Sequence, residues 1–291
     1  MKLTKQTKIL IIGLGVMGGS YARALTKQGF SVRCITKQQE DIDYALAEGM
    51  IAEGTTETRA EWIGSADLIV FALYPLTFIA WMKENAHLIK KGTVITDVSG
   101  VKSGVISEIQ KLLPEGVEFI SAHPMAGRER SGVAFSDDSV FKGANYIVVP
   151  TEQNTEEAIL LCEDLGRALG FFRISRLSAE THDAMIAFLS QLTHCIAVSL
   201  MNCNDAPDME KYTGDSFRDL TRIAKINENM WSELFLLNKN ALLHEMDAFQ
   251  KEFSAFRALL EAEDREGMKE KMRHSTSKRM KFDKPKGSTA P

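Results

Sequence analysis

The sequence predicts an α/β protein in which a doubly wound, mostly parallel sheet is followed by an all-helical C-terminal part. Residues 8–150 alternate between short β-rich runs and amphipathic helical segments, which is typical of a parallel sheet covered by helices. After about residue 176 the β-rich runs stop and only helical spacing continues. A glycine-rich turn directly after the first β-rich run is the third observation, since such turns are common in this fold class.

The expected strands are short runs rich in β-branched residues, at 8–12, 31–35, 68–73, 93–97, 119–121, 146–150 and 171–175. Apolar positions at helical spacing predict helices among them, at 21–28, 104–113 and 156–169, and after them, at 177–202, 217–225, 230–250 and 252–263. We therefore expect one domain over residues 1–175 and a helical domain over residues 176–283. The polar end of the chain, residues 284–291, is expected to be a disordered tail.

Composition narrows the class of protein. The chain has 291 residues and a net charge of −4, so a nucleic-acid partner is not expected, because such binders usually have a basic face. The four cysteines lack C-x-x-C spacing, which argues against a metal site and against a disulfide scaffold. We expect no transmembrane helix, because no apolar run approaches the roughly 18–20 residues of a membrane span, and no signal peptide, because the N-terminus lacks a small-residue cleavage site. We expect a cytoplasmic protein with no membrane partner.

Residues 9–18 have the order strand, G-x-G-x-x-G, helix. Gly13 would permit the tight turn, Gly15 would let the backbone approach a pyrophosphate, and Gly18 would let the helix pack closely on the strand. The free N–H groups at the start of that helix would then hold the phosphates. The pattern predicts a Rossmann-type dinucleotide-binding domain over residues 1–175; the alternative is a glycine-rich turn in an unrelated α/β protein. The expected cofactor-binding residues of this turn are Gly13, Leu14, Gly15, Val16, Met17 and Gly18.

The end of the second strand bears on the choice between NAD and NADP. An Asp or Glu there would bind the ribose 2′-hydroxyl of NAD, but Thr36 occupies the position and Lys37 follows it. A missing carboxylate beside a cation favours NADP. NAD remains the alternative if Glu40 or Asp41 supplies the carboxylate, or if Lys37 is only a solvated surface residue.

A second strand end carries a candidate acid/base. The run at 119–121 leads into His123, Pro124 and, at residue 127, a glycine. In an open parallel sheet, chemistry gathers beyond the carboxyl ends of the strands, and a histidine there can exchange a proton near neutral pH. Together with the glycine motif, this pattern predicts a redox enzyme. From the residues alone, a hydrogen-bonded structural histidine is an equally good interpretation of His123.

With these motifs in view, the chain resembles the prephenate/arogenate dehydrogenase family of tyrosine biosynthesis, from about residue 8 to about residue 260. The resemblance implies a Rossmann domain and a helical domain that forms a homodimer. It also implies oxidative decarboxylation of prephenate to 4-hydroxyphenylpyruvate, or of arogenate to tyrosine. The segments that carry it are Gly13–Gly18, Asp97–Lys102, His123–Gly127, His182-Asp183, Ser190–His194 and Phe217–Ala224.

The resemblance also implies roles for single residues. His123 would take the proton of the substrate's C4 hydroxyl as hydride leaves for the nicotinamide. The substrate is a dianion and needs cations, and Arg218 and Arg222 are spaced to share a helix face. The family pattern places Arg222 on a substrate carboxylate and Arg218 in an ionic network with Asp219 and Glu129. A solvated helix face is the ordinary interpretation of such an arginine pair.

The same pattern puts His194 at the substrate with Ser190 nearby, and gives His182 a supporting role. A histidine in an apolar helix is more often a satisfied core residue. Met230, Trp231 and the apolar positions around Leu234 and 237 are expected to serve in helix packing and dimer contact, without chemistry.

Three positions depart from the family pattern. Gly100 stands where a serine would hydrogen-bond the C4 hydroxyl and the histidine, so Ser99, a water or a backbone group would have to substitute as substrate ligand. Gln191 stands where a histidine is common, and Arg128 where threonine is frequent. Two rival functions stay open: a β-hydroxyacid dehydrogenase, which would usually rely on a lysine in the helical domain, and a non-catalytic NADP-sensing protein, which would need neither His123 nor Arg222.

Overall fold

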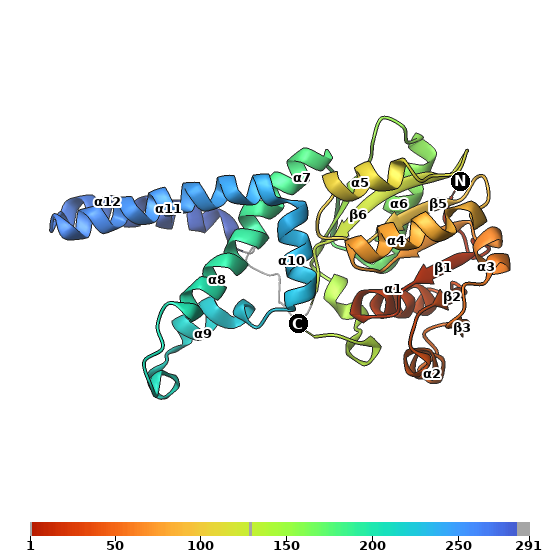
Figure 1. Cartoon of the computed structure of the whole chain (residues 1–291), viewed down its shortest axis with the longest axis horizontal. Helices are drawn as coiled ribbons and strands as arrows, with labels where there is room; N and C mark the ends of the chain where they lie inside the picture. The colour runs from red at the N-terminus through yellow and green to blue at the C-terminus, as the bar shows by residue number, and fades with distance from the viewer. Residues whose placement is uncertain (1, 128–129, 284–291) are drawn as a thin grey trace. The chain divides into compact units, whose positions relative to one another are not determined.

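The computed structural model describes residues 2–127 and 130–283. The chain divides into two compact units, residues 1–239 and residues 240–291. The first unit holds the whole sheet and the helices from α1 to α10, and the second holds nearly all of α11 together with α12 (Figure 1). The predicted domain boundary between residues 175 and 176 falls inside the first unit, within the last strand of the sheet, and stays a prediction. The predicted tail at 284–291 lies outside the described residues.

The sheet has the predicted α/β topology. Its eight strands lie in the order β3-β2-β1-β4-β5-β6-β7-β8, and every neighbouring pair is parallel except β6 and β7. Because the strand order reverses at β1 and β4, their carboxyl ends form the crevice where open α/β sheets bind ligands. The strands are β1 (Ile9–Ile12), β2 (Val32–Ile35), β3 (Glu53–Thr55), β4 (Leu68–Phe71), β5 (Val94–Asp97), β6 (Glu118–Pro124), β7 (Asn145–Val149) and β8 (Arg173–Arg176).

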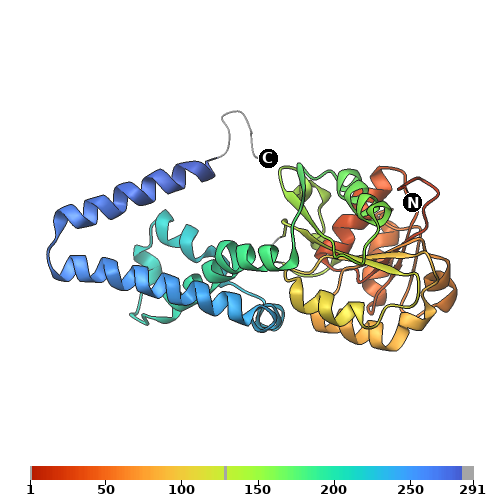
Figure 2. The same ribbon diagram turned by 90° about the horizontal axis from the view of Figure 1, so that it is seen from above.

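Helices cover both faces of the sheet, with α1 and α6 on one face and α4 and α5 on the other (Figure 2). The helices of the first unit are α1 (Val16–Lys27), α2 (Gln39–Ala47), α3 (Ala60–Ser65), α4 (Pro75–Asn85), α5 (Ser103–Gln110), α6 (Glu156–Leu169), α7 (Ala179–Ile186), α8 (Thr193–Asn202), α9 (Asp215–Thr221) and α10 (Glu228–Leu237). A π-helical segment, Ala187–Leu192, joins α7 to α8, and a 3₁₀ turn, Arg222–Ala224, follows α9.

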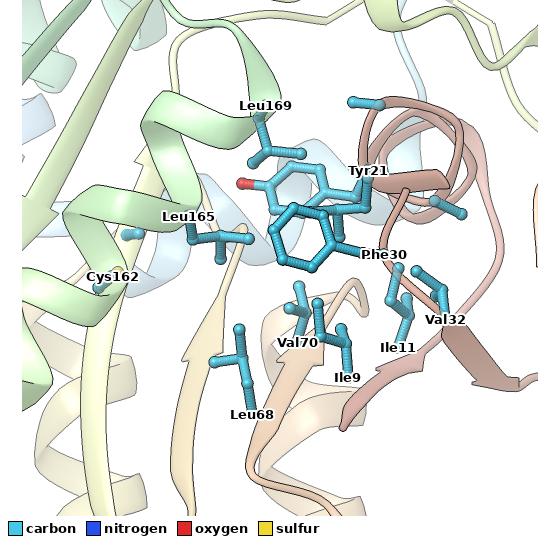
Figure 3. Packing of buried hydrophobic residues seen from close by; sticks show 14 of the residues in the cluster. Ile9, Ile11, Tyr21, Phe30, Val32, Leu68, Val70, Cys162, Leu165 and Leu169 are labelled. Atoms are coloured by element: carbon cyan, nitrogen blue, oxygen red, sulfur yellow. The ribbon is translucent and has the colours of Figure 1, made fainter. Parts of the chain in front are cut away.

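The hydrophobic core lies in two layers because successive side chains of a strand point to opposite faces of the sheet. Ile9 and Ile11 of β1 face the layer under α1 and α6, where the ring of Tyr21 is fully buried (Figure 3). Leu10 and Ile12 face the opposite layer, under α4 and α5. Both faces are apolar, so the parallel strands read as continuous apolar runs rather than alternating ones.

Three features of the fold differ from the sequence prediction. Strand β3 was not expected, since its three residues carry only a short β signal around Gly54. The helix expected over 230–250 is interrupted at Asn238, whose buried side chain donates hydrogen bonds to Asp183 O (2.9 Å) and Gln191 Oε1 (2.8 Å). Beyond that break, α11 (Lys239–Glu261) continues through the expected boundary at 250–252, and α12 (Arg265–Arg279) is an additional helix.

We expected no run long and apolar enough to span a membrane, and this expectation was wrong as a statement about length and composition. The helical run Ala179–Asn202 passes that test by length and composition, with a mean hydropathy of 1.7. The run also carries three buried polar side chains that hydrogen-bond inside the protein: His182, Asp183 and Gln191. Its buried face therefore contributes polar contacts as well as apolar packing to the fold.

The glycines of the first turn yield a test of the fold. A Cβ added at Gly18 would lie 2.1 Å from Gly13 O, whereas a Cβ at Gly15 would meet no atom within 4 Å. We expect Gly18→Ala to lower the free energy of unfolding by about 1–3 kcal/mol, because α1 must move away from β1. Gly15→Ala is the matched control and should unfold at the wild-type temperature. Thermal unfolding followed by circular dichroism compares the two, and equal melting temperatures would contradict this packing.

Candidate active site

The glycine turn between β1 and α1 is shaped to admit a phosphate group. Gly13 has φ +96°, a conformation that favours glycine, and its N–H donates to Ile35 O (2.8 Å). A Cβ on Gly13 would lie 2.5 Å from Ala72 O, so this turn is held against the end of β4. Gly15 forms the N-cap of α1 without a side-chain cap and faces open space. The turn thus leaves the first N–H groups of α1 without a side-chain cap, and no atom lies within 4 Å of a Cβ built at Gly15, so a dinucleotide pyrophosphate can approach the backbone here.

The residues expected to decide between NAD and NADP follow directly after β2 in the chain. Thr36 is buried and its N–H donates to Thr55 O (3.1 Å), while Lys37 is exposed. Glu40 and Asp41 lie in the first turn of α2. The cation and the carboxylates therefore both lie just beyond β2, where an adenine ribose would be recognised.

A buried ion pair links the carboxyl end of β5 to β6. Lys102 and Asp97 are both fully buried, and Lys102 Nζ lies 3.2 Å from each carboxylate oxygen of Asp97. The ammonium also donates to Ala122 O (2.6 Å), and the Asp97 carboxylate accepts from Ser121 Oγ (2.7 Å) and Ala122 N (3.0 Å). Burial lowers the pKa of Lys102, and the Asp97 carboxylate opposes that shift. The pair fixes the strand residue that precedes His123.

His123 lies near the carboxyl end of β6 and is half-buried. Its Nδ1 is 2.8 Å from His182 Nε2, and His182 Nδ1 is 2.8 Å from Asp183 Oδ1. Burial holds the pKa of His123 well below its ordinary value, and His182 and Lys102 lower it further. The imidazole is therefore neutral at neutral pH, which is the state that a general base requires.

Gly100, which stands where the family pattern has a serine, has room for a side chain next to His123. A Cβ at Gly100 would lie 4.0 Å from His123 Cε1 and 3.5 Å from Leu234 Cδ1, which is ordinary van der Waals contact. One residue earlier, Ser99 Oγ is buried and has no hydrogen-bond partner within the part of the chain that the structure describes. A buried hydroxyl without a partner is uncommon in folded proteins, and the expected role of Ser99 as a ligand for the substrate stays a prediction.

His194 lies against α10. Its Nδ1 donates to Ser190 O (2.8 Å), so Ser190 contributes its backbone carbonyl to this contact. The His194 ring stacks on Trp231, with ring centroids 3.8 Å apart and an interplanar angle of 31°. Trp231 and Leu234 are three residues apart on α10 and share a helix face. One face of α10 therefore lies against His194, through Trp231, and beside Gly100, through Leu234. The sequence predicted helix packing and dimer contact for Trp231 and Leu234, but not this proximity to candidate site residues.

The predicted arginines lie on exposed surface. Arg218 pairs with Asp215 (3.3 Å), rather than with the expected Asp219, and donates to Thr213 O. Arg222 begins the 3₁₀ turn after α9, and this turn packs against α8. Glu129, the other expected partner of Arg218, lies outside the described residues, as does Arg128. Their places in a substrate site remain predictions.

Gln191, one of the departures from the family pattern, has a structural role. Its Nε2 donates to Leu234 O (2.9 Å), and its Oε1 accepts from Asn238 Nδ2 (2.8 Å). The buried amide therefore provides hydrogen-bond partners for a carbonyl in the last turn of α10 and for the Asn238 side chain at the helix break. Nothing in the local sequence signals these contacts, because the partners lie more than 40 residues away.

Fold and site define a class: a nicotinamide-nucleotide-dependent oxidoreductase with a Rossmann domain and a helical domain. Residues 21–170 match the family model described as "Prephenate dehydrogenase, nucleotide-binding domain", and residues 178–274 match "Prephenate dehydrogenase, dimerization domain". The chain belongs to the prephenate dehydrogenase family. The first match begins after the glycine turn, so the assignment of that turn rests on its own geometry.

Individual relatives agree with the family match. The chain is 30% identical over 268 residues to prephenate dehydrogenase of Bacillus subtilis, and the aligned region covers 89% of this chain and 72% of the relative. It is 29% identical over 280 residues to cyclohexadienyl dehydrogenase of Zymomonas mobilis, which covers 94% of each chain. The crystal structure of prephenate dehydrogenase from A. aeolicus in complex with hydroxyphenyl propionate and NAD⁺ has a TM-score of 0.89 at 29% identity, over 97% of this chain and 100% of that one.

The buried ion pair offers a test of what holds the site together. We expect Lys102→Met to lower the free energy of unfolding by about 3–5 kcal/mol, because it leaves the Asp97 carboxylate buried without its cation. The double variant Asp97→Asn/Lys102→Met removes both charges and should be more stable than Lys102→Met alone. Chemical unfolding of the three proteins measures both differences. A Lys102→Met variant as stable as the wild type would contradict this account of the pair.

Proposed function

We propose that this chain oxidatively decarboxylates prephenate to 4-hydroxyphenylpyruvate with a nicotinamide nucleotide as hydride acceptor, in tyrosine biosynthesis. The observation that carries the proposal is the neutral His123 near the carboxyl end of β6, beside Gly100, in a chain of the prephenate dehydrogenase family. The rival β-hydroxyacid chemistry and the non-catalytic sensor both leave this histidine arrangement unexplained.

In the proposed reaction, His123 takes the proton of the C4 hydroxyl while the C4 hydrogen leaves as hydride. The bound nicotinamide supplies the acceptor for that hydride. The electrons of the bond to the ring carboxylate then flow into the ring as carbon dioxide leaves, and the ring becomes aromatic. The proton held on His123 returns to the phenolate oxygen, so the reaction releases no net proton from the enzyme.

Several other residues are proposed to hold the substrate. Arg222 would bind a carboxylate of the dianion, and Arg218 with Glu129 would form a charged group at the mouth of the site. His194, oriented by Ser190 O and by the ring of Trp231, would contact the substrate from the helical side. Ser99 would supply the hydroxyl that other family members place at position 100.

We further propose NADP as the preferred cofactor, because Lys37 follows β2 where a carboxylate would select NAD. Glu40 and Asp41 keep NAD as the alternative, and the A. aeolicus relative is described in complex with NAD⁺. A homodimer is also proposed. Its support is the dimerization-domain match together with exposed apolar side chains on the helices, among them Phe188 and Leu189 in the first unit and Phe253 in the second.

The substrate and the cofactor are tested in one assay. Purified protein is offered prephenate or arogenate with NADP or NAD, and reduced nucleotide is followed by absorbance. We expect the highest kcat/KM for prephenate with NADP, and we expect Lys37→Ala to lower kcat/KM for NADP while leaving that for NAD unchanged. A faster reaction with arogenate would reassign the substrate, and a clear preference for NAD would refute the role of Lys37. Tight NADP binding without turnover of either substrate would favour the sensor function.

The pH dependence of kcat/KM tests His123 as the base. The base must be neutral, so activity is lost as pH falls through its pKa in the free enzyme. Because burial lowers the pKa of His123, with His182 and Lys102 adding to the effect, we expect the acidic limb to lie below the ordinary histidine value of about 6.5. An acidic limb centred above that value would be incompatible with a half-buried His123 of lowered pKa as the base.

A further inference from the structure

We propose that Asp183 and His182 act as positioning residues that fix the tautomer of His123, so that Nδ1 carries the proton and Nε2 is the atom that accepts a proton from the substrate. The tautomer follows from the hydrogen-bonded chain that joins the three side chains. The use of Nε2 as base rests in addition on the proposed dehydrogenase function.

The fixed end of the chain is the Asp183 carboxylate. Its Oδ1 accepts from Lys102 N and its Oδ2 from Ser103 N, both at 2.8 Å. These N–H groups begin α5, which has no side-chain cap of its own, so Asp183 of α7 caps a neighbouring helix. Burial alone would raise the pKa of Asp183, but hydrogen bonds from His182, Ser103 and Lys102 outweigh burial and hold the pKa below its usual value. The carboxylate is ionised at neutral pH and can only accept hydrogen bonds.

The middle of the chain is His182, whose side chain is fully buried. Its Nδ1 lies 2.8 Å from Asp183 Oδ1 and must donate, since the carboxylate only accepts. Burial lowers the pKa of His182 and outweighs the opposing effect of Asp183, so the ring carries one proton. With that proton on Nδ1, Nε2 holds a lone pair and acts as an acceptor.

The reactive end is His123. Its Nδ1 lies 2.8 Å from His182 Nε2, which accepts, so His123 Nδ1 donates. A neutral imidazole carries one proton, and Nε2 of His123 is therefore the basic nitrogen. The titratable groups that face this ring in the described structure are His182 from α7 and Lys102 from the start of α5. When Nε2 takes the substrate proton, the Nδ1–H bond to His182 becomes charge-assisted and stabilises the imidazolium.

Two substitutions at His182 separate the acceptor role from simple packing. His182→Leu fills part of the space but cannot accept a hydrogen bond, whereas the amide oxygen of His182→Gln can accept from His123 Nδ1. Ile186→Val, a buried change in the same helix with no polar contact to lose, controls for disturbance of α7. Nitrogen-15 NMR of histidine-labelled protein at neutral pH reports which ring nitrogen of His123 is protonated, and steady-state kinetics report kcat and KM.

We expect the wild type to show His123 protonated at Nδ1. His182→Leu should lose this single tautomer and lower kcat at least about tenfold with little change in KM, because proton transfer suffers more than binding. His182→Gln should keep the Nδ1 proton and a kcat well above that of the leucine variant, and Ile186→Val should behave as the wild type.

Protonation of His123 at Nε2 in the wild type would overturn the proposal, and this result requires no variant to fold. An equal loss of kcat in His182→Leu and His182→Gln, with the tautomer unchanged, would also overturn it in favour of a packing role. If the wild type has the expected tautomer but turns over neither prephenate nor arogenate, the proposed function fails while the tautomer assignment stands. If the wild type turns over prephenate but carries the His123 proton on Nε2, the tautomer assignment fails while the proposed function stands.

Discussion

The carboxylate of Asp183 is the contact on which the geometry of the candidate site depends. It caps α5 through two backbone N–H groups and accepts from His182, which in turn meets His123. A single anion therefore sets the position of a helix on one face of the sheet and the orientation of a side chain at the end of β6. Because a buried carboxylate keeps its charge only while its hydrogen bonds are made, the two functions are coupled in one interaction.

Lys102 likewise makes more than one buried polar contact that stabilises the site. Lys102 supplies its backbone N–H to Asp183 and its ammonium to Asp97, so the two buried carboxylates are linked through one residue. Burial makes each of these groups costly unless it is paired, and it also keeps His123 neutral. The desolvation that the fold must offset is thus the cause of the neutral state of His123 that the proposed reaction uses. Ser99 Oγ is a buried polar atom without a hydrogen-bond partner among the described residues.

The parts of the fold that depend on local sequence could be predicted. Apolar runs ending in glycine identified β1 and its turn, and the strand that ends in His123 was expected from its sequence pattern. The helix break at Asn238 could not be predicted, because the contacts that stabilise it come from residues about 50 positions away. The hydrogen bond between His182 and His123 was hidden for the same reason. Asp183 follows His182 directly, so helical spacing gave no signal that both side chains serve one chain of hydrogen bonds.

The central claim is that His123 is the base of a prephenate-oxidising enzyme, and His123→Asn tests it most directly. The measurement compares kcat with the dissociation constants of cofactor and prephenate in the variant and the wild type. We predict that kcat falls by about 10²–10⁴-fold, the usual range for loss of a general base, while both dissociation constants stay close to wild type. A variant that turns over prephenate at the wild-type rate would contradict the account.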